Sequence, residues 1–252
     1  MKYLGIPLFE KLSRGWLQSG KDFVYPPRCV LCGLDRLCEG VDCGLPIQQI
    51  APEIVEACER CGAPAGPHLD TSTGCSYCRN ERFLFKRAIA LGKYQGPLRE
   101  LILKLKQNHG AHLGGNLGSL LYYRNAETLE NLGADLIIPV PLHWTARLHR
   151  SHNPASLIAE ALSSRLQAKS NVHILAKRIR TPAQTSLTPS ARRKNLQNAF
   201  RVRRSSRVAD LSILLVDDVM TTGSTANAAA NALLEAGARE INVAVIARAP
   251  GH

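Results

Sequence analysis

The chain has 252 residues, of which 45% are hydrophobic, and a formal net charge of +12. This length and apolar fraction allow one large domain, or one medium and one small domain, with a sizeable core. No apolar run approaches the ~20 residues that a membrane-spanning helix needs, and residues 1–23 lack the apolar core and cleavage site of a secretory signal. We therefore expect a cytoplasmic protein with no membrane span.

The positive charge is confined to the second part of the sequence. Residues 1–82 hold nine Lys and Arg against ten Asp and Glu, whereas residues 83–252 hold 23 against 10. The segment 177–207 contains ten basic residues and no acidic one. Such a field attracts anions, and it is compatible with pyrophosphate, with nucleic acid or with both.

Residues 1–24 form the first predicted element. Leu4, Leu8, Leu12 and Trp16 recur at helical spacing, which predicts a helix that packs on the rest of the chain. A helix lying on a membrane surface is the alternative, and it is disfavoured because the polar face is only mildly basic.

Residues 25–82 are organised by cysteine. Two cysteine thiolates separated by two residues (Cys-x-x-Cys) bind one metal from a tight turn. Two such turns complete a tetrahedral four-thiolate site. Eight ligands therefore predict two structural zinc ions, and we favour the pairing of consecutive cysteines over an interleaved one. Disulfides and a redox role are the alternatives; the lack of a secretory signal argues against disulfides. The predicted ligands of the two sites are Cys29, Cys32, Cys38 and Cys43, then Cys58, Cys61, Cys75 and Cys78.

Residues 83–252 predict an α/β domain with a mostly parallel, doubly wound sheet, because apolar strands alternate with amphipathic helices. Residues 25–82 would then be a small double zinc-ribbon domain on its N-terminal side. The expected strands are 87–94, 135–141, 172–176, 213–216 and 241–246, and the expected helices are 97–106, 113–123, 154–167 and the Ala-rich segment from 226 to 236.

The segment between residues 213 and 225 carries the chemistry. Four apolar residues predict a buried strand, two carboxylates follow, and a run of Thr, Gly and Ser precedes the Ala-rich helix. Unpaired amides at a helix N-terminus attract phosphate, and Gly223 allows a close backbone approach. The carboxylates would repel a phosphate, so they need hydroxyl groups or a metal. One ligand that carries a 5′-phosphate and a ribose diol would suit both parts of the segment: the phosphate binds the amides, and the diol binds the carboxylates.

This segment resembles the phosphoribosyl-pyrophosphate (PRPP) motif of type I phosphoribosyltransferases. The resemblance implies that Asp217 and Asp218 hold the ribose hydroxyls and that the loop from Thr221 to Thr225 holds the 5′-phosphate. An ordinary strand-to-helix turn is the structural alternative. The implied PRPP-binding residues are Asp217, Asp218, Val219, Met220, Thr221, Thr222, Gly223, Ser224 and Thr225.

Over residues 22–248 the chain resembles the ComF family, which joins a double zinc ribbon to a phosphoribosyltransferase domain. The motifs that carry this resemblance are Tyr25-Pro26-Pro27-Arg28-Cys29, Leu103-Lys104-Leu105-Lys106, Val140-Pro141-Leu142, Arg178-x-Arg180-Thr181-x-x-Gln184 and Arg192-x-x-Asn195-Leu196-x-Asn198-Ala199-Phe200. Two departures stand out. Arg150-Ser151-His152-Asn153-Pro154 replaces the family's Arg-Gly-Phe-Asn-Gln, and four residues separate Cys38 from Cys43.

The resemblance implies roles for further residues. Lys106 and Gln107 fall at the pyrophosphate-loop position, and Arg178 and Arg180 are candidates for a catalytic loop that closes over the diphosphate, with Mg²⁺ accompanying PRPP. Asp217 and Asp218 complete the catalytic set.

Three functions fit the residues. The first is a PRPP-dependent transferase with an unknown acceptor, acting in DNA uptake or utilisation. The second is a non-catalytic, PRPP-responsive protein that binds single-stranded DNA, and other DNA-uptake proteins are further expected partners. The third is a structural adaptor whose loop is a relic.

Overall fold

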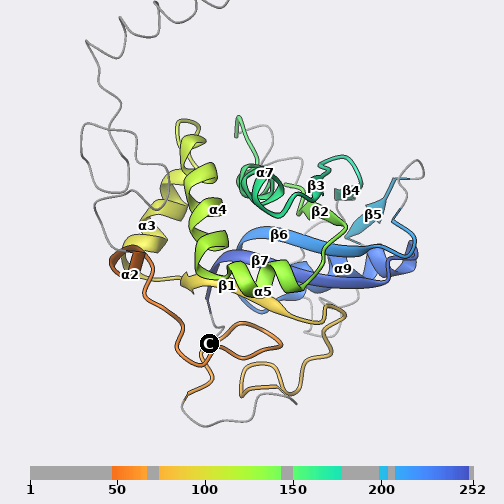
Figure 1. The fold of residues 1–252 in the computed structure, drawn as a ribbon, viewed down its shortest axis with the longest axis horizontal. Helices are drawn as coiled ribbons and strands as arrows, with labels where there is room; N and C mark the ends of the chain where they lie inside the picture. Colours follow the sequence, from red (N-terminus) through yellow and green to blue (C-terminus); the bar gives the residue numbers. More distant parts are fainter. Residues whose placement is uncertain (1–46, 67–73, 143–149, 178–198, 204–207, 250–252) are drawn as a thin grey trace, which may run out of the picture. The chain divides into compact units, whose positions relative to one another are not determined.

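The computed structural model describes residues 47–66, 74–142, 150–177, 199–203 and 208–249 (Figure 1). All of these residues belong to one compact unit. Within them, a five-stranded sheet has the order β1-β7-β6-β2-β3, and every neighbouring pair in it is parallel. A separate antiparallel pair joins β4 to β5. The predicted mostly parallel α/β fold is confirmed.

The elements have the following bounds. The strands are β1 (Ala88–Lys93), β2 (Leu136–Pro139), β3 (Lys169–Ser170), β4 (Leu175–Lys177), β5 (Phe200–Val202), β6 (Ser212–Met220) and β7 (Glu240–Arg248). The helices are α2 (Ile47–Ile50), α3 (Gly96–Leu105), α4 (His112–Arg124), α5 (Ala126–Asn131), α7 (Pro154–Leu166) and α9 (Ser224–Glu235).

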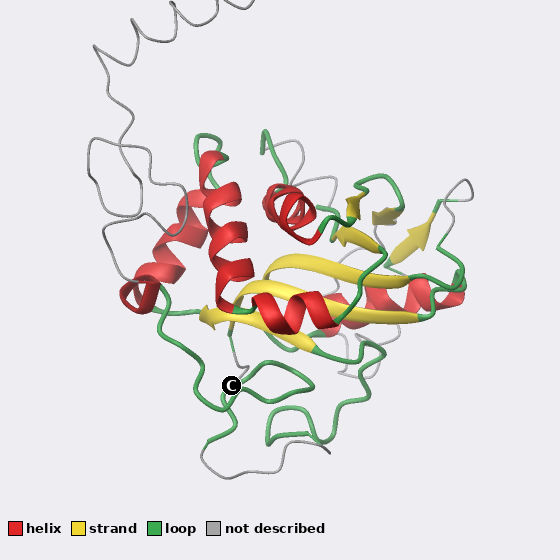
Figure 2. Cartoon of the chain, viewed as in Figure 1, coloured by secondary structure: helices red, strands yellow, loops and turns green. Residues whose placement is uncertain are grey.

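The two central strands, β6 and β7, are apolar on both faces, as a parallel sheet covered on both sides requires. Ile213 and Leu215 of β6 share one buried cluster with Ala229 and Leu233 of α9. The alternate residues, such as Leu214, are equally buried but lie outside that cluster, because successive side chains of a strand point to opposite faces. That second face is covered by α7, which contacts β2 and β6 (Figure 2).

Helices α4 and α7 approach each other closely through glycine. A Cβ atom at Gly114 would lie 2.3 Å from the Cβ atom of Leu157, and one at Gly118 would lie 2.7 Å from the Cβ atom of Ala161. Any larger residue would push the two helices apart, so the small residues fix how α7 lies over β6.

The outcome differs from the predicted elements in three places, besides the short elements α2, β3 and β5, which were not predicted. Strand β4 begins at Leu175 and not at residue 172, because Asn171 accepts the backbone N–H of His173 and holds that stretch in a turn. Strand β6 continues to Met220, so the two aspartates lie within the strand. The short helix α5 was not predicted.

The cysteine-bearing segment packs in the same hydrophobic cluster as the sheet. Cys58, Cys61, Cys75 and Cys78 are buried there together with Phe85 and residues of β6 and β7. The predicted helix over residues 1–24 lies outside the described residues, and the division of the chain at residues 24 and 82 stays a prediction. In the part of the chain that the structure describes, no helix is long and apolar enough to cross a membrane.

Candidate functional site

The loop between β6 and α9 has the geometry of an anion site. Gly223 occupies the N-cap position of α9 with φ of 80° and has no side chain to cap the helix; the Ser224 amide makes a long hydrogen bond of 3.4 Å to Thr222 Oγ1. The first intrahelical bond runs from the Asn227 amide to the Gly223 carbonyl. The amides of the first turn are therefore directed at the loop, with the helix dipole behind them. The hydroxyl oxygens of Thr222 and Ser224 lie 2.5 Å apart, so one hydroxyl donates to the other and the second can donate to a ligand.

The two aspartates lie at the carboxyl end of β6, directly before this loop. Both are half-buried, and the backbone N–H of Asp218 donates to Asp217 Oδ1 at 2.8 Å. Burial, and next the negative charge of Asp218, raise the pKa of Asp217 to about 7, against the opposing effects of that hydrogen bond and of Lys106 and Lys177. Two carboxylates held side by side in a desolvated position favour a partner that donates protons or carries positive charge.

Lys106 supplies a cation to this pair from a distant part of the sequence. It follows α3 directly, and its Nζ lies 3.1 Å from Asp218 Oδ2. The pair is only partly accessible, with 25% of the Lys106 side chain and 14% of the Asp218 side chain exposed. Gln107, the next residue, is exposed in the turn after α3. The structure thus brings Lys106 to the twin acids, and its predicted role towards pyrophosphate stays a prediction.

The segment Arg150–Pro154, where the chain departs from its expected motif, lies against the same turn. The Ser151 amide donates to Asn108 Oδ1 at 3.1 Å, and His152 Nε2 lies 2.7 Å from the Leu105 carbonyl oxygen. Asn153 caps α7 by accepting the Ala155 amide, and its Nδ2 donates to the Val140 carbonyl. The residues that replace the family motif therefore tie the start of α7 to the end of α3.

Cavities occur at both ends of the sheet. A cavity of about 30 Å³ lies at the β6–α9 loop, between Asp217 and Thr225. Two larger ones, of about 250 and 580 Å³, lie towards the opposite ends of the strands, near Arg87 and Glu59. In open parallel sheets ligands bind outside the carboxyl ends of the strands. The chemistry of the lining residues and the topology of the sheet therefore favour the smaller cavity, and not the two larger ones, as the ligand-binding site.

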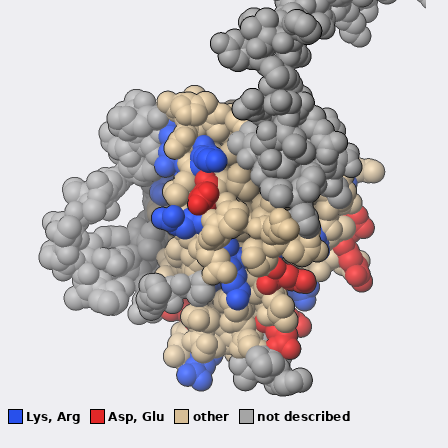
Figure 3. Space-filling view, turned by 90° about the vertical axis from the view of Figure 1, so that its left-hand side faces the viewer, with Lys and Arg blue, Asp and Glu red and all other residues tan. Residues whose placement is uncertain are grey.

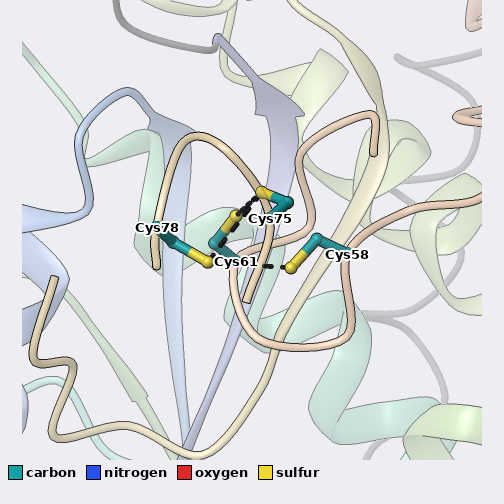
Figure 4. A group of neighbouring side chains, drawn as sticks. All are labelled: Cys58, Cys61, Cys75 and Cys78. Atoms are coloured by element: carbon teal, nitrogen blue, oxygen red, sulfur yellow. Dashed lines mark hydrogen bonds between the residues drawn. The ribbon is translucent and has the colours of Figure 1, made fainter. Parts of the chain in front are cut away.

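Four cysteines form a second candidate site. The Sγ atoms of Cys58, Cys61, Cys75 and Cys78 all lie within 4.8 Å of one another and converge on one point (Figure 4). The separations are 3.7 Å for Cys58–Cys78, 3.6 Å for Cys61–Cys75 and 3.9 Å for Cys75–Cys78. A tetrahedral zinc ion with Zn–S bonds of ~2.3 Å places its sulfurs about 3.8 Å apart. The donor set and the spacing therefore fit one zinc ion.

Burial of the cluster changes the pKa values of its thiols. Burial strongly raises the pKa of the Cys61 thiol and raises that of Cys78 to about 11. For Cys58 burial also raises the pKa, but hydrogen bonds from backbone amides outweigh it and lower the value to about 7. Four neighbouring thiolates would repel one another without a metal. All four cysteines are free, so the structure shows no disulfide among them.

The remaining predicted residues lie outside the described part of the chain. They are Cys29, Cys32, Cys38, Cys43, Arg178 and Arg180. The second zinc site and the catalytic arginines therefore stay predictions.

On the face drawn in Figure 3, basic side chains occur in small groups. Figure 3 shows several Lys and Arg groups on one face, with acidic side chains among and below them. Most of the basic stretch 177–207 lies outside the described residues. The visible surface thus gives no support for a continuous basic face.

Residues that the sequence interpretation missed connect the two sites. Arg248 at the end of β7 donates to the Cys61 carbonyl in the cysteine cluster and to the Met220 carbonyl beside the β6–α9 loop. Phe83 and Asn227 make further contacts between these two regions. The one available signal was a charged residue at the end of an otherwise apolar strand.

Comparison with known proteins agrees with this geometry. Residues 153–252 match the model of the phosphoribosyl transferase domain. The chain therefore contains a domain of the phosphoribosyltransferase type.

Similar proteins define the family more closely. The chain is 34% identical over 180 residues to competence protein F of Haemophilus influenzae, covering 69% of this chain and 78% of that protein. It is 31% identical over 195 residues to DNA utilization protein YhgH of Escherichia coli O157:H7, covering 76% and 83%, and 30% identical over 197 residues to that of Salmonella typhi, covering 77% and 85%. The chain belongs to the ComF family.

Among solved structures the likeness is partial. The glutamine PRPP amidotransferase from B. subtilis matches with a TM-score of 0.32 and 22% identity, covering 46% of this chain and 25% of that chain.

Proposed function

We propose that this protein binds PRPP at the β6–α9 loop and transfers its phosphoribosyl group to an acceptor in the handling of DNA. The observation that carries the proposal is the meeting of three groups at one edge of the sheet. There the backbone amides of the first turn of α9 lie near the pair Asp217 and Asp218. The cation of Lys106 lies at the same place, in contact with Asp218. A ligand with a terminal phosphate, a diol and a pyrophosphate matches all three.

In the proposed complex the 5′-phosphate accepts hydrogen bonds from the amides of Thr221 to Thr225 and from the nearby hydroxyls. The ribose hydroxyls donate to Asp217 and Asp218. Mg²⁺ bound with PRPP would balance the diphosphate charge. Lys106, whose Nζ is 3.1 Å from Asp218, would turn towards the diphosphate when ribose hydroxyls replace it at the carboxylate.

The proposed reaction replaces the bond between C1 of the ribose and pyrophosphate by a bond between C1 and the acceptor nucleophile. Pyrophosphate leaves with the bonding electron pair, and the acceptor loses one proton. A carboxyl with a pKa of about 7, as at Asp217, suits a proton acceptor at neutral pH, although binding the ribose is a sufficient role for it. Arg178 and Arg180 are proposed to close over the leaving group.

The cysteine cluster is proposed to hold a structural zinc ion. Four thiolates complete the tetrahedral shell, so such a zinc ion leaves no position for a reacting water. Its contribution would be to the folding of the segment around residues 58–78. A second zinc ion on Cys29, Cys32, Cys38 and Cys43 is proposed on spacing alone.

A second function remains open to test: a PRPP-responsive protein that binds single-stranded DNA without catalysis. Ten basic residues without an acidic one in residues 177–207 favour it. The names of the relatives, competence protein F and DNA utilization protein, also point to DNA. Electrostatic binding to DNA weakens steeply with salt. A titration at two salt concentrations tests this function, and absence of binding at the lower one rejects it.

The main test of the transferase is pyrophosphate release. Purified protein, PRPP and Mg²⁺ are mixed with a panel of nucleobases, amines and short DNA strands, and the double variant Asp217→Asn/Asp218→Asn is the control. We expect at least one acceptor to release pyrophosphate with the wild type and not with the control. Saturable PRPP binding without any release would favour the binding protein, and no PRPP binding would reject both.

A further inference from the structure

Arg248 is the charged residue of the described core that needs an explanation. It is the last residue of β7, and it is only 2% exposed. A buried charge is costly unless hydrogen bonds compensate for it. Among the described residues no carboxylate forms an ion pair with it. Its compensation comes from backbone carbonyl groups instead.

The two sides of the guanidinium contact different sites. Nε donates to the carbonyl oxygen of Cys61 at 2.8 Å, within the cysteine cluster. Nη1 donates to the carbonyls of Met220 at 3.1 Å and of Thr221, where the phosphate loop begins, and to that of Ala249 at 2.8 Å. One rigid, planar group therefore connects the cysteine cluster to the phosphate loop.

Two further contacts join the same regions. Phe83 lies against Gly223, since a Cβ atom at this glycine would meet the phenyl ring at 3.0 Å. The side chain of Asn227, in the first turn of α9, accepts the Leu84 amide at 2.6 Å and donates to the Arg82 carbonyl at 3.3 Å. The segment 82–84 follows Cys78 by only a few residues. The cluster and the loop thus share one continuous packed network.

The bond from Arg248 to Thr221 also orients the loop. In a trans peptide the carbonyl of one residue and the N–H of the next point in opposite directions. Holding the Thr221 carbonyl towards Arg248 therefore turns the Thr222 amide away from it. The fixed positive charge behind the loop adds to the attraction for an anion.

We propose that Arg248 is a positioning residue that couples metal occupancy of the cysteine cluster to the order of the β6–α9 loop. A bound metal fixes the backbone of Cys61, the Cys61 carbonyl fixes Arg248, and Arg248 holds the loop in the form that receives a phosphate. The ligand part of this proposal rests on the proposed function, since it takes PRPP to be that phosphate. Coupling is reciprocal, so PRPP also tightens zinc binding.

A purely structural role for Arg248 makes different predictions. A residue that only fastens the end of β7 would lower global stability when it is replaced. It would not make the loop respond to the metal, and it would not make zinc retention respond to PRPP. The test therefore follows loop order and metal retention separately from stability.

The primary experiment is hydrogen–deuterium exchange of residues 219–226 in zinc-loaded and chelator-treated full-length protein. The variants are Arg248→Met, Arg248→Lys, which retains the charge but loses the fork that reaches both sites, and Arg239→Met as a control on a half-exposed arginine. We expect metal removal to speed loop exchange roughly tenfold in the wild type and in the Arg239 variant, a typical size for coupling. In Arg248→Met the loop exchanges fast with and without zinc.

Two further readouts complete the test. PRPP slows zinc release to a chelator in the wild type and in Arg239→Met, but not in Arg248→Met or Arg248→Lys. Zinc removal weakens PRPP binding roughly tenfold in the same two proteins and not in the Arg248 variants. Loop exchange that ignores zinc in folded wild type, or a zinc response that persists in Arg248→Met, overturns the proposal. If chelation unfolds the whole chain, zinc-loaded Arg248→Met is compared with zinc-loaded Arg239→Met, and equal loop exchange overturns it. If PRPP does not bind, the proposed function fails while the exchange experiment still decides the coupling.

Discussion

Asp217→Asn should stabilise the ligand-free protein, and more so at high pH. The carboxyl of Asp217 has an ordinary pKa of 3.8, which folding raises to about 7. Between these values the unfolded chain releases a proton that the folded chain keeps, so ionisation costs folding stability as pH rises. The cost is roughly 1–2 kcal/mol at pH 5 and about 4 kcal/mol at pH 8. The change of folding stability with pH therefore has the opposite sign to that of a salt-bridged aspartate, which stabilises the fold more as pH rises.

The assay is urea denaturation of the wild type and of Asp217→Asn at pH 5 and pH 8. We expect the gain from the substitution to grow by about 2–3 kcal/mol between the two pH values. Asp210→Asn is the matched control, because Asp210 has 88% of its side chain exposed, and its gain should stay within about 0.5 kcal/mol at both pH values. A gain that is absent, or that does not grow with pH, would refute the electrostatic reasoning about the twin acids.

Three other predictions follow from the described contacts. Gly223→Ala should destabilise the protein by about 1–2 kcal/mol and weaken PRPP binding, because φ is 80° and a Cβ would press on Phe83. Gly133→Ala is the control in a thermal melt: with φ of 54° and open space around it, it should show the backbone cost alone. Lys106→Met should weaken PRPP binding about tenfold or more by calorimetry, whereas Lys104→Met, on the exposed side of α3, should leave it unchanged. Chelation should release zinc and increase hydrogen exchange of residues 58–78, and unchanged exchange there would contradict a metal site.

Much of the sheet was predictable because its strands are continuous apolar runs. The runs at 213–216 and 241–246 fall inside β6 and β7, and the glycine after α9, Gly237, adopts a left-handed conformation with φ of 95°, as glycines at helix ends often do. The helix from Pro154 begins where a proline follows a capping Asn153. In these segments the local sequence pattern and the burial agree, so the sequence alone is sufficient to predict the strand or helix.

Pairing over long distances was not predictable. Strand β4 pairs with β5, and the partners of Leu175 and Lys177 are Val202 and Phe200. Such short strands have no hydrophobic period of their own, so only their pairing defines them. The basic stretch between them gave no signal that its two ends meet.

The candidate site was predictable in its motif but not in its surroundings. The spacing of the cysteines and the acidic pair before Thr221 both indicated chemistry directly. Only the family resemblance pointed to Lys106, and its ion pair with Asp218 could not be read from the sequence. The bonds of Arg248 depend on how β7 ends beside the loop, which no local pattern encodes.

The most direct test of the central claim is a crystal structure of the protein with PRPP and Mg²⁺. We predict density for the 5′-phosphate at the amides of Thr221 to Thr225 and for the ribose hydroxyls at Asp217 and Asp218. Density for PRPP only at the opposite end of the sheet, near Arg87, or none at the loop at saturating PRPP, would contradict the account.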